Sequence, residues 1–297
     1  MKKNAIIILI HKMPEQVNLF LEQLLADTNM DIYIHINKKF DSIREKLIKN
    51  ERIIVPTNNL EIVWGDENIL KAILLMMKTV RDSGIDYGYV LINTGQDLLL
   101  KSGIDDFLSQ QHNKIFIDGH KENNRRRAYV MHRWPNYYRR LMDFKFHPVK
   151  MMRRLRMEFY TLFPICEKKT KFDVSNVTFY YNEFWCVIPQ EVSNYVLDYC
   201  GDNPDFLDIY MDGLVPEEAF MLTLLMMSKY KDWIEFDVQG YSHNLTYLKG
   251  ATNGHTQTNT CEDIDTLDRS GCFFSRKFDL NVDKEAVMHY YKKICKN

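Results

Sequence analysis

Two adjacent carboxylates, Glu217 and Glu218, follow Pro216 and open a stretch rich in Met and Leu. Acidic side chains in the first turn of a helix complement the helix dipole, so this position alone favours a structural role. At a strand-to-helix junction beside a crevice, a carboxylate can also take the proton from a hydroxyl nucleophile. The pair therefore supplies a candidate general base.

Two adjacent cations, Arg276 and Lys277, lie between Phe274 and Phe278. A lysine in such a segment can neutralise a departing diphosphate, which is the task of a metal ion in many enzymes that cleave nucleotide diphosphates. The alternative, of equal weight, is a surface charge pair with apolar residues packed around it.

Three ring-bearing residues could contact a ligand. Trp64 precedes Gly65 and could stack on a nucleobase, although a tryptophan in the core is the more common outcome. His11 and His35 lie at or near the ends of predicted strands, where a hydrogen-bonded core histidine is more common than a ligand-binding one.

Asp97 is a lone acid after a predicted strand. Two aspartates spaced D-x-D at a strand end would hold a divalent cation against a nucleotide diphosphate, but no such pair occurs there. Asp263-Ile264-Asp265 has the spacing but lies in a helical stretch. The sequence therefore predicts no metal site.

The elements that must position these side chains alternate between strands and helices. Ala5–Ile10 is a continuous apolar run, typical of a strand buried on both faces of a parallel sheet. The alternation predicts an α/β fold with a mostly parallel, doubly wound sheet flanked by helices, which binds ligands at the carboxyl ends of its strands. We expect strands at 5–10, 31–37, 52–55 and 87–93, helices at 14–25, 40–49 and 68–80, and a turn at 94–97. No G-x-G-x-x-G follows the first strand and no G-x-x-x-x-G-K-[ST] occurs, which argues against Rossmann and P-loop sites.

The second half of the chain begins with a basic segment. Residues 121–156 hold twelve Lys and Arg against two acids, with Tyr, Trp and Phe interleaved, so the rest of the chain carries about −11. Such a segment indicates contact with phosphate groups or an anionic bilayer, and an exposed, solvated hairpin is the equally weighted alternative. Beyond it we expect a strand pair at 177–187, carrying Glu183 and Trp185, and helices at 191–199 and 217–230.

The composition is that of a folded globular protein. Apolar residues make up 45% of the 297 residues, charged residues 27% and aromatic residues 13%, and the net charge of −1 argues against a nucleic-acid binder. The apolar run 5–10 is too short for a membrane span or a signal peptide, so we expect a cytoplasmic protein. Six cysteines without a C-x-x-C pair predict free thiols.

Taken in order, seven segments resemble the bacterial members of the core-2/I-branching β-1,6-N-acetylglucosaminyltransferase family. No single motif is specific, but seven in register over about residues 5–280 are hard to obtain by chance. The segments are Ile8–Lys12, Ile32–Lys39, Val63–Gly65, Tyr89–Asp97, Phe184–Cys186, Val215–Glu218 and Arg276–Asp279.

The resemblance implies a GT-A glycosyltransferase that inverts configuration and uses a UDP-sugar without a divalent metal. The family's catalytic base falls on Glu218, with Glu217 in place of an Asp, and its diphosphate-binding lysine falls on Lys277. A second diphosphate cation would fall on Gln257, so His255 or Arg276 would have to substitute for it. The family's uracil contact falls on Trp64, and an Asp near the uridine is replaced by Asn37. We place His11 and Asp97 in the same donor site, and Arg125, Arg127, Glu183 and Trp185 in the acceptor site.

The resulting expectation is one glycosyltransferase domain over 1–297 with a basic, aromatic-rich insertion at about 121–171. It would transfer N-acetylglucosamine, or alternatively xylose, from UDP to a hydroxyl of a glycan or lipid-linked glycan in cell-surface polysaccharide synthesis. We expect no cofactor, and a cytoplasmic location with peripheral contact to the anionic inner face of the cell membrane. The alternatives are a nucleotide-sugar-binding protein without catalysis and a membrane-surface adaptor that acts through 121–156.

Overall fold

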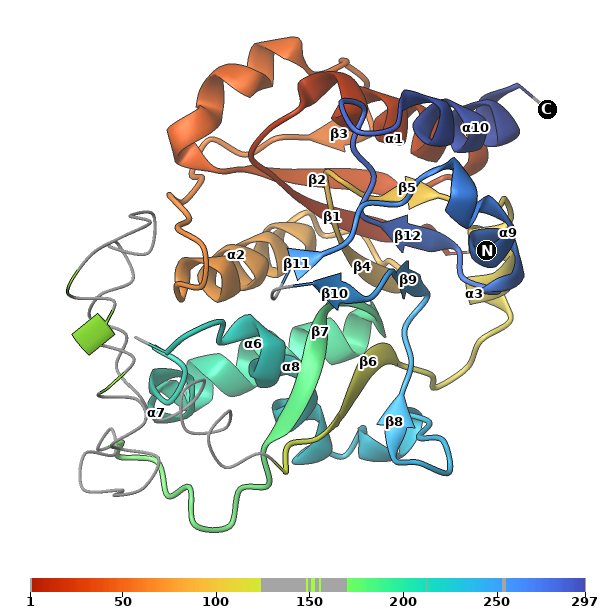
Figure 1. Cartoon of the computed structure of the whole chain (residues 1–297). Helices are drawn as coiled ribbons and strands as arrows, with labels where there is room; N and C mark the ends of the chain where they lie inside the picture. The colour runs from red at the N-terminus through yellow and green to blue at the C-terminus, as the bar shows by residue number, and fades with distance from the viewer. Residues whose placement is uncertain are drawn as a thin grey trace.

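A central sheet of seven strands in the order β3-β2-β1-β4-β7-β6-β8 organises the molecule (Figure 1). The computed structural model describes residues 2–123, 148, 151–152, 155, 170–211, 213–252 and 255–296. β3, β2, β1 and β4 are parallel, β7 is antiparallel to β4 and β6, and β8 is antiparallel to β6. The strands span Ala5–Ile10 (β1), Asp31–Ile36 (β2), Ile53–Ile54 (β3), Tyr89–Thr94 (β4), Phe116–Lys121 (β6), Tyr180–Pro189 (β7) and Tyr241–Ser242 (β8).

Both faces of the parallel half are covered, which explains why β1 is apolar at every position. Successive side chains of a strand point to opposite faces. Ala5 and Ile7 accordingly join one hydrophobic core, while Ile6, Ile8 and Ile10 join the other.

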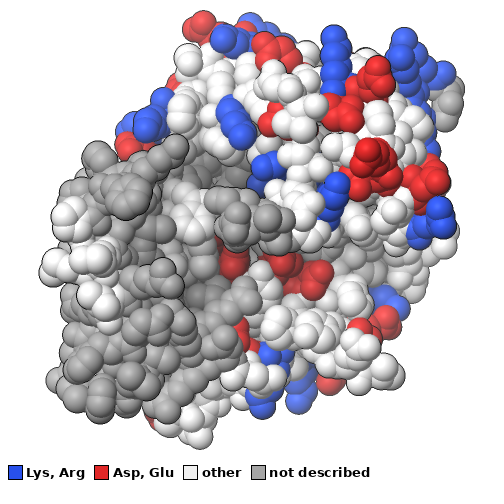
Figure 2. All heavy atoms as spheres, in the orientation of Figure 1, with Lys and Arg blue, Asp and Glu red and all other residues white. Residues whose placement is uncertain are grey.

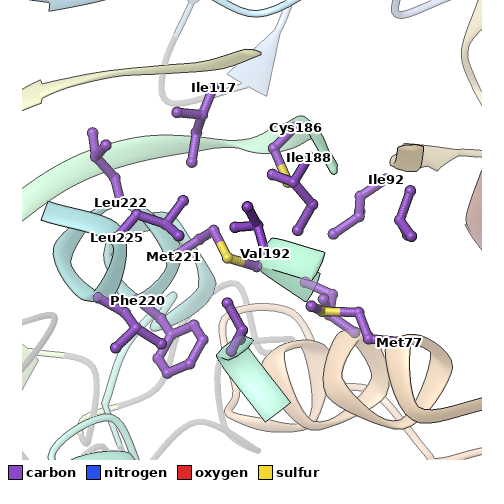
Figure 3. Packing of buried hydrophobic residues seen from close by; sticks show 14 of the residues in the cluster. Met77, Ile92, Ile117, Cys186, Ile188, Val192, Phe220, Met221, Leu222 and Leu225 are labelled. Atoms are coloured by element: carbon purple, nitrogen blue, oxygen red, sulfur yellow. The ribbon is translucent and has the colours of Figure 1, made fainter. Parts of the chain in front are cut away.

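One face of the sheet packs against the helices α2 (Asn68–Asp82), α6 (Gln190–Asp202), α7 (Pro204–Asp208) and α8 (Glu217–Met226). Figure 3 shows this core, where Phe220, Met221 and Leu225 of α8 lie below Ile117 and Ile188 of the sheet. Since aliphatic and aromatic side chains fill this layer, α8 has a fixed position under the antiparallel strands.

The other face packs against α1 (Pro14–Asp27), α3 (Ile104–Ser109), α9 (Ile264–Arg269) and α10 (Lys284–Cys295). A small sheet in the order β5-β12-β9 completes this layer, with β5 at Leu98–Leu99, β12 at Phe274–Arg276 and β9 at Thr246–Leu248. The short elements β10 (Ala251–Thr252), β11 (His255–Thr256), η1 (Lys38–Lys46), η5 (Lys231–Trp233) and η6 (Cys261–Asp263) lie in the connections.

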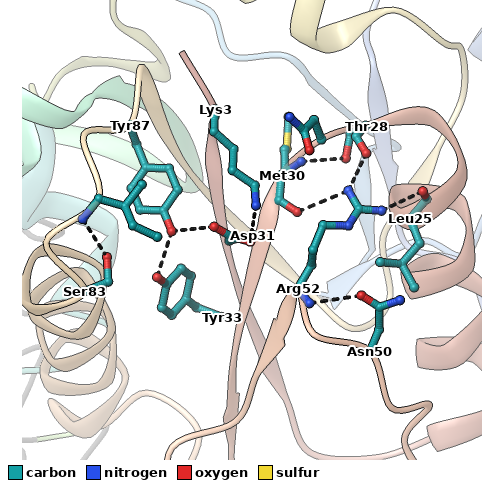
Figure 4. Close-up of polar contacts among 12 residues, drawn as sticks. Lys3, Leu25, Thr28, Met30, Asp31, Tyr33, Asn50, Arg52, Ser83 and Tyr87 are labelled. Carbon is teal, nitrogen blue, oxygen red and sulfur yellow. Dashed lines mark hydrogen bonds and ion pairs between the residues drawn. The ribbon is translucent and has the colours of Figure 1, made fainter. Parts of the chain in front are cut away.

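Polar side chains fix the amino ends of the parallel strands (Figure 4). The ammonium of Lys3 lies 2.6 Å from the carboxylate of Asp31, which also accepts a hydrogen bond of 2.7 Å from Tyr87. Arg52 donates to the carbonyl of Leu25 at 2.7 Å. A separate cavity of about 580 Å³ opens at this edge, between the starts of β1 and β4 and the end of β7. These groups are structural and lie at the edge opposite the carboxyl ends.

Most of the predicted elements are confirmed, and three differ. The expected helix at 40–49 is the 3₁₀ segment η1, which is broken at Phe40. The expected strand pair at 177–187 is one strand, β7, because Asn182 directs its side chain to α8 instead of forming a turn. Helix α8 ends at Met226 and not at 230. Just after its end, the hydroxyl of Ser228 donates to the carbonyl of Leu225 at 2.7 Å.

The α/β class is confirmed, as a mixed sheet with helices on both faces and five of its seven strands running in one direction. The described cysteines are free, as expected, and Cys166 lies outside the described residues. Nearly all of the basic insertion at 121–171 also lies outside them. Within the described part of the chain, no helix has the length and apolar character needed to cross a membrane.

Candidate active site

Asp97 organises the turn after β4. It is fully buried, and its carboxylate accepts hydrogen bonds from the amide of Thr94 at 2.8 Å, the side chain of Asn93 at 3.0 Å and the indole of Trp185 at 2.8 Å. Burial raises the pKa of Asp97, and the charge of Arg276 together with these hydrogen bonds opposes that rise. The side chain that we placed in the donor site therefore acts inside the protein, where it ties β4 to β7.

Arg276 lies over the ring of Trp185. It is therefore not part of a surface charge pair, which was the alternative role considered for this segment. Its guanidinium lies 3.8 Å from the carboxylate of Asp97 and 4.9 Å from the centre of the indole ring of Trp185, and it bonds to the hydroxyl of Thr94. Its side chain is 21% exposed. Burial lowers the pKa of Arg276, while Asp97 and Glu183 oppose this effect, so the guanidinium stays charged at the carboxyl end of β4.

Lys277 is held at the same edge by its backbone. The amide of Phe278 donates to the carbonyl of Gln96 at 2.9 Å, and the amide of Asn259 donates to the carbonyl of Lys277 at 2.8 Å. Phe278 is fully buried and anchors this segment in the core. The half-buried ammonium of Lys277 has no hydrogen-bond or ion-pair partner among the described residues, so it can receive an anionic ligand.

His11 and His35 have different environments. His35 is a hydrogen-bonded core histidine, the more common of the two roles considered for it. Its Nε2 accepts a hydrogen bond from the amide of Leu60 at 2.9 Å, and burial lowers its pKa to about 4. His11 is accessible and is not the core histidine that was considered more common for it. Partial burial, followed by the charges of Lys12 and Arg276, lowers the pKa of His11 to about 4, so its ring is neutral near pH 7. His11 therefore lies close to Arg276.

Asn37 supports the loop that carries Trp64. Its side chain donates to the carbonyl of Ile62 at 2.7 Å and accepts from the amides of Ile62 at 3.3 Å and Lys39 at 3.2 Å. It is only 6% exposed. The structure thus gives Asn37 partners within the protein, at the carboxyl end of β2.

Trp64 is 54% exposed, so the core alternative is wrong for this residue. Gly65 follows with φ +74°, a conformation that favours glycine. A Cβ atom there would lie 2.9 Å from Leu214, and the carbonyl of Gly65 accepts a hydrogen bond from Val215 at 3.1 Å. The tryptophan loop is therefore docked on the segment that leads into α8.

The two carboxylates at the start of α8 differ. Glu217 is 8% exposed, and burial, then Glu218, then Asp66 raise its pKa well above the usual value, which favours its protonated form. Glu218 is half-buried. The side chain of Asn182 donates to the carbonyl of Glu217 at 3.1 Å and so attaches this helix start to β7. Glu218 is thus the more exposed member of the pair.

Glu183 and Trp185 lie two residues apart on β7, where its pairing with β6 shifts register. Trp185 is 6% exposed, held by Asp97 beneath Arg276, so it shapes the site from inside. Glu183 is half-buried and accepts a hydrogen bond from the hydroxyl of Tyr181 at 3.0 Å. Its charge also acts on Asp118 of β6: burial first, and Glu183 second, raise the pKa of Asp118 to about 6, while His243 opposes them. Asp118 was not among the residues expected in the site. A signal for it was present in the sequence, because it is an acid in a strand that could pair with the strand carrying Glu183.

The remaining expected residues are not brought into this arrangement. Arg125 and Arg127 lie outside the described residues. Gln257 is exposed, and its backbone amide donates to the carbonyl of Gly250 at 3.2 Å. Of His255 only the backbone, in β11, is described. Arg276 is thus the described cation next to Lys277.

Figure 2 shows acidic side chains gathered near the middle of the face seen in Figure 1, below several Lys and Arg. Among the described residues, no group of three or more His, Cys, Asp or Glu could hold a metal ion. The arrangement offers a partly exposed carboxylate, an ammonium without a partner in the described part of the chain, and an exposed indole. No protein-family model matches the chain, and neither does any curated protein.

Proposed function

We propose that this protein is an inverting glycosyltransferase of GT-A-like fold that transfers a sugar from UDP to an acceptor hydroxyl without a divalent metal. One observation carries the proposal: the segments that hold Glu218 and Lys277 are each bound to a loop at the carboxyl edge of the parallel strands. Val215 bonds to Gly65, which follows the loop bound to the end of β2, and Phe278 bonds to Gln96 in the turn after β4. These contacts hold the two segments at the carboxyl ends of β2 and β4, which flank β1 in the sheet, and α/β sheets bind their ligands at this edge.

In the proposed reaction the carboxylate of Glu218 takes the proton of the acceptor hydroxyl. The hydroxyl oxygen forms a bond to the anomeric carbon, and the bond from that carbon to the diphosphate oxygen breaks on the opposite side. The electron pair leaves with UDP, whose growing negative charge is stabilised by the ammonium of Lys277 and the nearby guanidinium of Arg276. The uracil stacks on the exposed ring of Trp64.

The substrate assignments extend the same proposal. N-acetylglucosamine is the favoured donor sugar and xylose the alternative, and the acceptor is a glycan or lipid-linked glycan of cell-surface polysaccharide synthesis. Residues 121–156 would hold that acceptor or the anionic membrane that carries it, with the protein on the cytoplasmic side. The support for these points is the resemblance of the seven segments and the charge of this region.

The test compares Glu218→Gln with the wild type. UDP, UDP-N-acetylglucosamine and UDP-xylose should each be titrated by calorimetry with EDTA present, and release of UDP should be followed as turnover. We expect Glu218→Gln to lose about 100-fold or more in turnover, because general-base catalysis contributes at least that much, while its UDP affinity stays within about twofold. Glu51→Gln, which removes an exposed carboxylate just before the amino end of β3, at the edge of the sheet opposite the site, is the control. Turnover of Glu218→Gln within a few-fold of the wild type, or a wild type that binds no UDP compound, would refute the proposal.

A nucleotide-sugar-binding protein without catalysis is the second candidate, and the environment of Asn37 favours it. The carboxamide that replaces a family Asp is occupied by the loop at Ile62. In that case the wild type would bind UDP-sugars, but hydrolysis and transfer would be absent and Glu218→Gln would change nothing. Measurement of slow UDP-sugar hydrolysis over many hours separates the two functions.

A further inference from the structure

The antiparallel half of the sheet presents three rings in a row across three strands. In the strand register His120 of β6 is paired with Tyr181 of β7 on one side and with Tyr241 of β8 on the other. The ring centres of His120 and Tyr181 are 5.3 Å apart, and those of His120 and Tyr241 are 4.9 Å apart. Tyr241 is 42% exposed and the other two are half-buried, so the row is accessible.

The opposite face of these strands serves the core. A Cβ atom at Gly119 would lie 2.5 Å from Leu222 of α8, and the side chain of Asn182 accepts a hydrogen bond from the amide of Leu222 at 3.2 Å. Ser242 is 1% exposed and donates to the carbonyl of Gly119. Gly119, Asn182 and Ser242 therefore attach the strands to one another and to α8, and Tyr181 also packs against the edge of this core.

Two carboxylates connect this row with the candidate active site. Glu183 lies two residues after Tyr181 on the same face of β7 and binds its hydroxyl at 3.0 Å. Asp118 lies two residues before His120 on β6 and interacts electrostatically with Glu183. Two residues further along β7, Trp185 lies under Arg276, whose charge is also felt by Glu183. A chain of neighbouring side chains thus leads from the rings through the two carboxylates to Arg276 at the end of β4.

We infer that this surface, formed by Tyr181, His120, Tyr241, Asp118 and Glu183 and here named the acceptor platform, binds the acceptor as a neutral pyranose and excludes anionic sugars. Aromatic rings pack well against the apolar C–H face of a sugar. Carboxylate oxygens accept strong hydrogen bonds from sugar hydroxyls. The same two carboxylates repel a uronic acid or a phosphate, which provides the discrimination. The inference rests on the proposed function because it names the second substrate of that site.

The test uses pairs of probes that differ only in charge. Methyl β-glucoside, methyl β-galactoside and methyl β-N-acetylglucosaminide are compared with methyl β-glucuronide and methyl β-galacturonide by saturation-transfer NMR at pH 7.5 with saturating UDP. We expect at least one neutral glycoside to bind, and its uronic acid counterpart to bind about fivefold or more weakly. Failure of all the neutral glycosides to bind, or binding of the uronic acids as tight as that of the neutral sugars, would overturn the inference.

Variants then locate the binding surface. Tyr241→Ala should weaken the neutral glycoside about fivefold or more, and Tyr241→Phe should keep the affinity because the ring remains. Val238→Ala is the matched control, since Val238 is a fully exposed apolar residue of the segment leading to the same strand. The double variant Asp118→Asn, Glu183→Gln should bring the uronic acid close to the affinity of the neutral sugar. Unchanged binding in Tyr241→Ala, or a preference for neutral sugars that persists in the double variant, contradicts the platform.

UDP binding, measured in the same samples, separates the two proposals. If UDP binds and the neutral sugars do not, the acceptor platform is wrong and the donor site stands. If the sugars bind to the platform and UDP binds nowhere, the proposed transferase fails, and the platform is not an acceptor site.

Discussion

Replacement of Asp118 by Asn should stabilise the protein at neutral pH and leave its stability unchanged in acid. The carboxyl group lies beside Glu183 in a partly buried position, and burial and that neighbour raise its pKa to about 6 from an ordinary value of 3.8. His243 opposes the rise. The folded state therefore holds a proton at a pH where the unfolded chain has already released it.

The sign and size of the effect follow from this difference. Because the folded pKa is the higher one, the folded state binds more protons between about pH 3.8 and 6, so its stability falls as the pH rises through that window. A shift of about two units corresponds to roughly 3 kcal/mol. Asp118 is partly exposed, and solvent screening reduces this figure to about 1–2 kcal/mol. Asn has a similar shape and no charge, so the variant avoids the loss.

Urea unfolding at pH 4, 5, 6 and 7.5 measures the difference between Asp118→Asn and the wild type. The two proteins should have equal midpoints at pH 4, and the variant should be more stable by about 1–2 kcal/mol at pH 7.5. Glu51→Gln removes an exposed carboxylate and should change the stability by less than about 0.5 kcal/mol at every pH. A variant that is less stable at pH 7.5, or a difference in stability that does not depend on pH, would show that folding does not raise the pKa of the Asp118 carboxyl group.

Three further changes probe other parts of the structure. Trp64→Ala should weaken UDP about tenfold in calorimetry without moving the urea midpoint, because the ring is 54% exposed and stacking contributes about 1–3 kcal/mol; equal affinity would remove Trp64 from the donor site. Lys277→Met should lower the turnover about 100-fold, and more than it lowers UDP affinity, because the ammonium opposes charge that grows in the transition state; steady-state kinetics in which only KM changes would contradict that role. Gly119→Ala should destabilise the fold by about 2–3 kcal/mol in urea, because its Cβ atom would lie 2.3 Å from the carbonyl oxygen of Tyr181. Gly201→Ala, whose Cβ atom meets no heavy atom within 4 Å, is its control, and equal midpoints for the two variants would be inconsistent with the observed packing.

The parallel half of the fold could be predicted because its signals are local. Ala5–Ile10 is apolar at every position since each residue enters one of two cores, and Pro14 starts the following helix in the way that its fixed φ allows. The expected ends of β1, β2 and β4 were therefore close to those observed.

The antiparallel half depends on contacts between distant residues, which no local pattern contains. The indole of Trp185 donates a hydrogen bond to Asp97, 88 residues earlier. Both residues were expected to contact a ligand, and in the structure they bind each other. The acceptor platform needs β8, a strand of two residues, to be in register with His120. A strand this short shows no periodicity in the sequence. Exposure of Trp64 was equally hidden, since it follows from the docking of Gly65 on Val215, 150 residues later.

The alternation along β6 and β7 separates two kinds of constraint within a few residues. Gly119 and Asn182 must fit α8, whereas Asp118, His120, Tyr181 and Glu183 face outward. If the proposed acceptor platform is right, substitutions at the partly exposed positions would change which sugar is recognised without moving the helix that begins with the two glutamates. Under the proposed function, acceptor preference would accordingly be free to diversify, in nature or in the laboratory, while the packing that holds α8 is inherited unaltered.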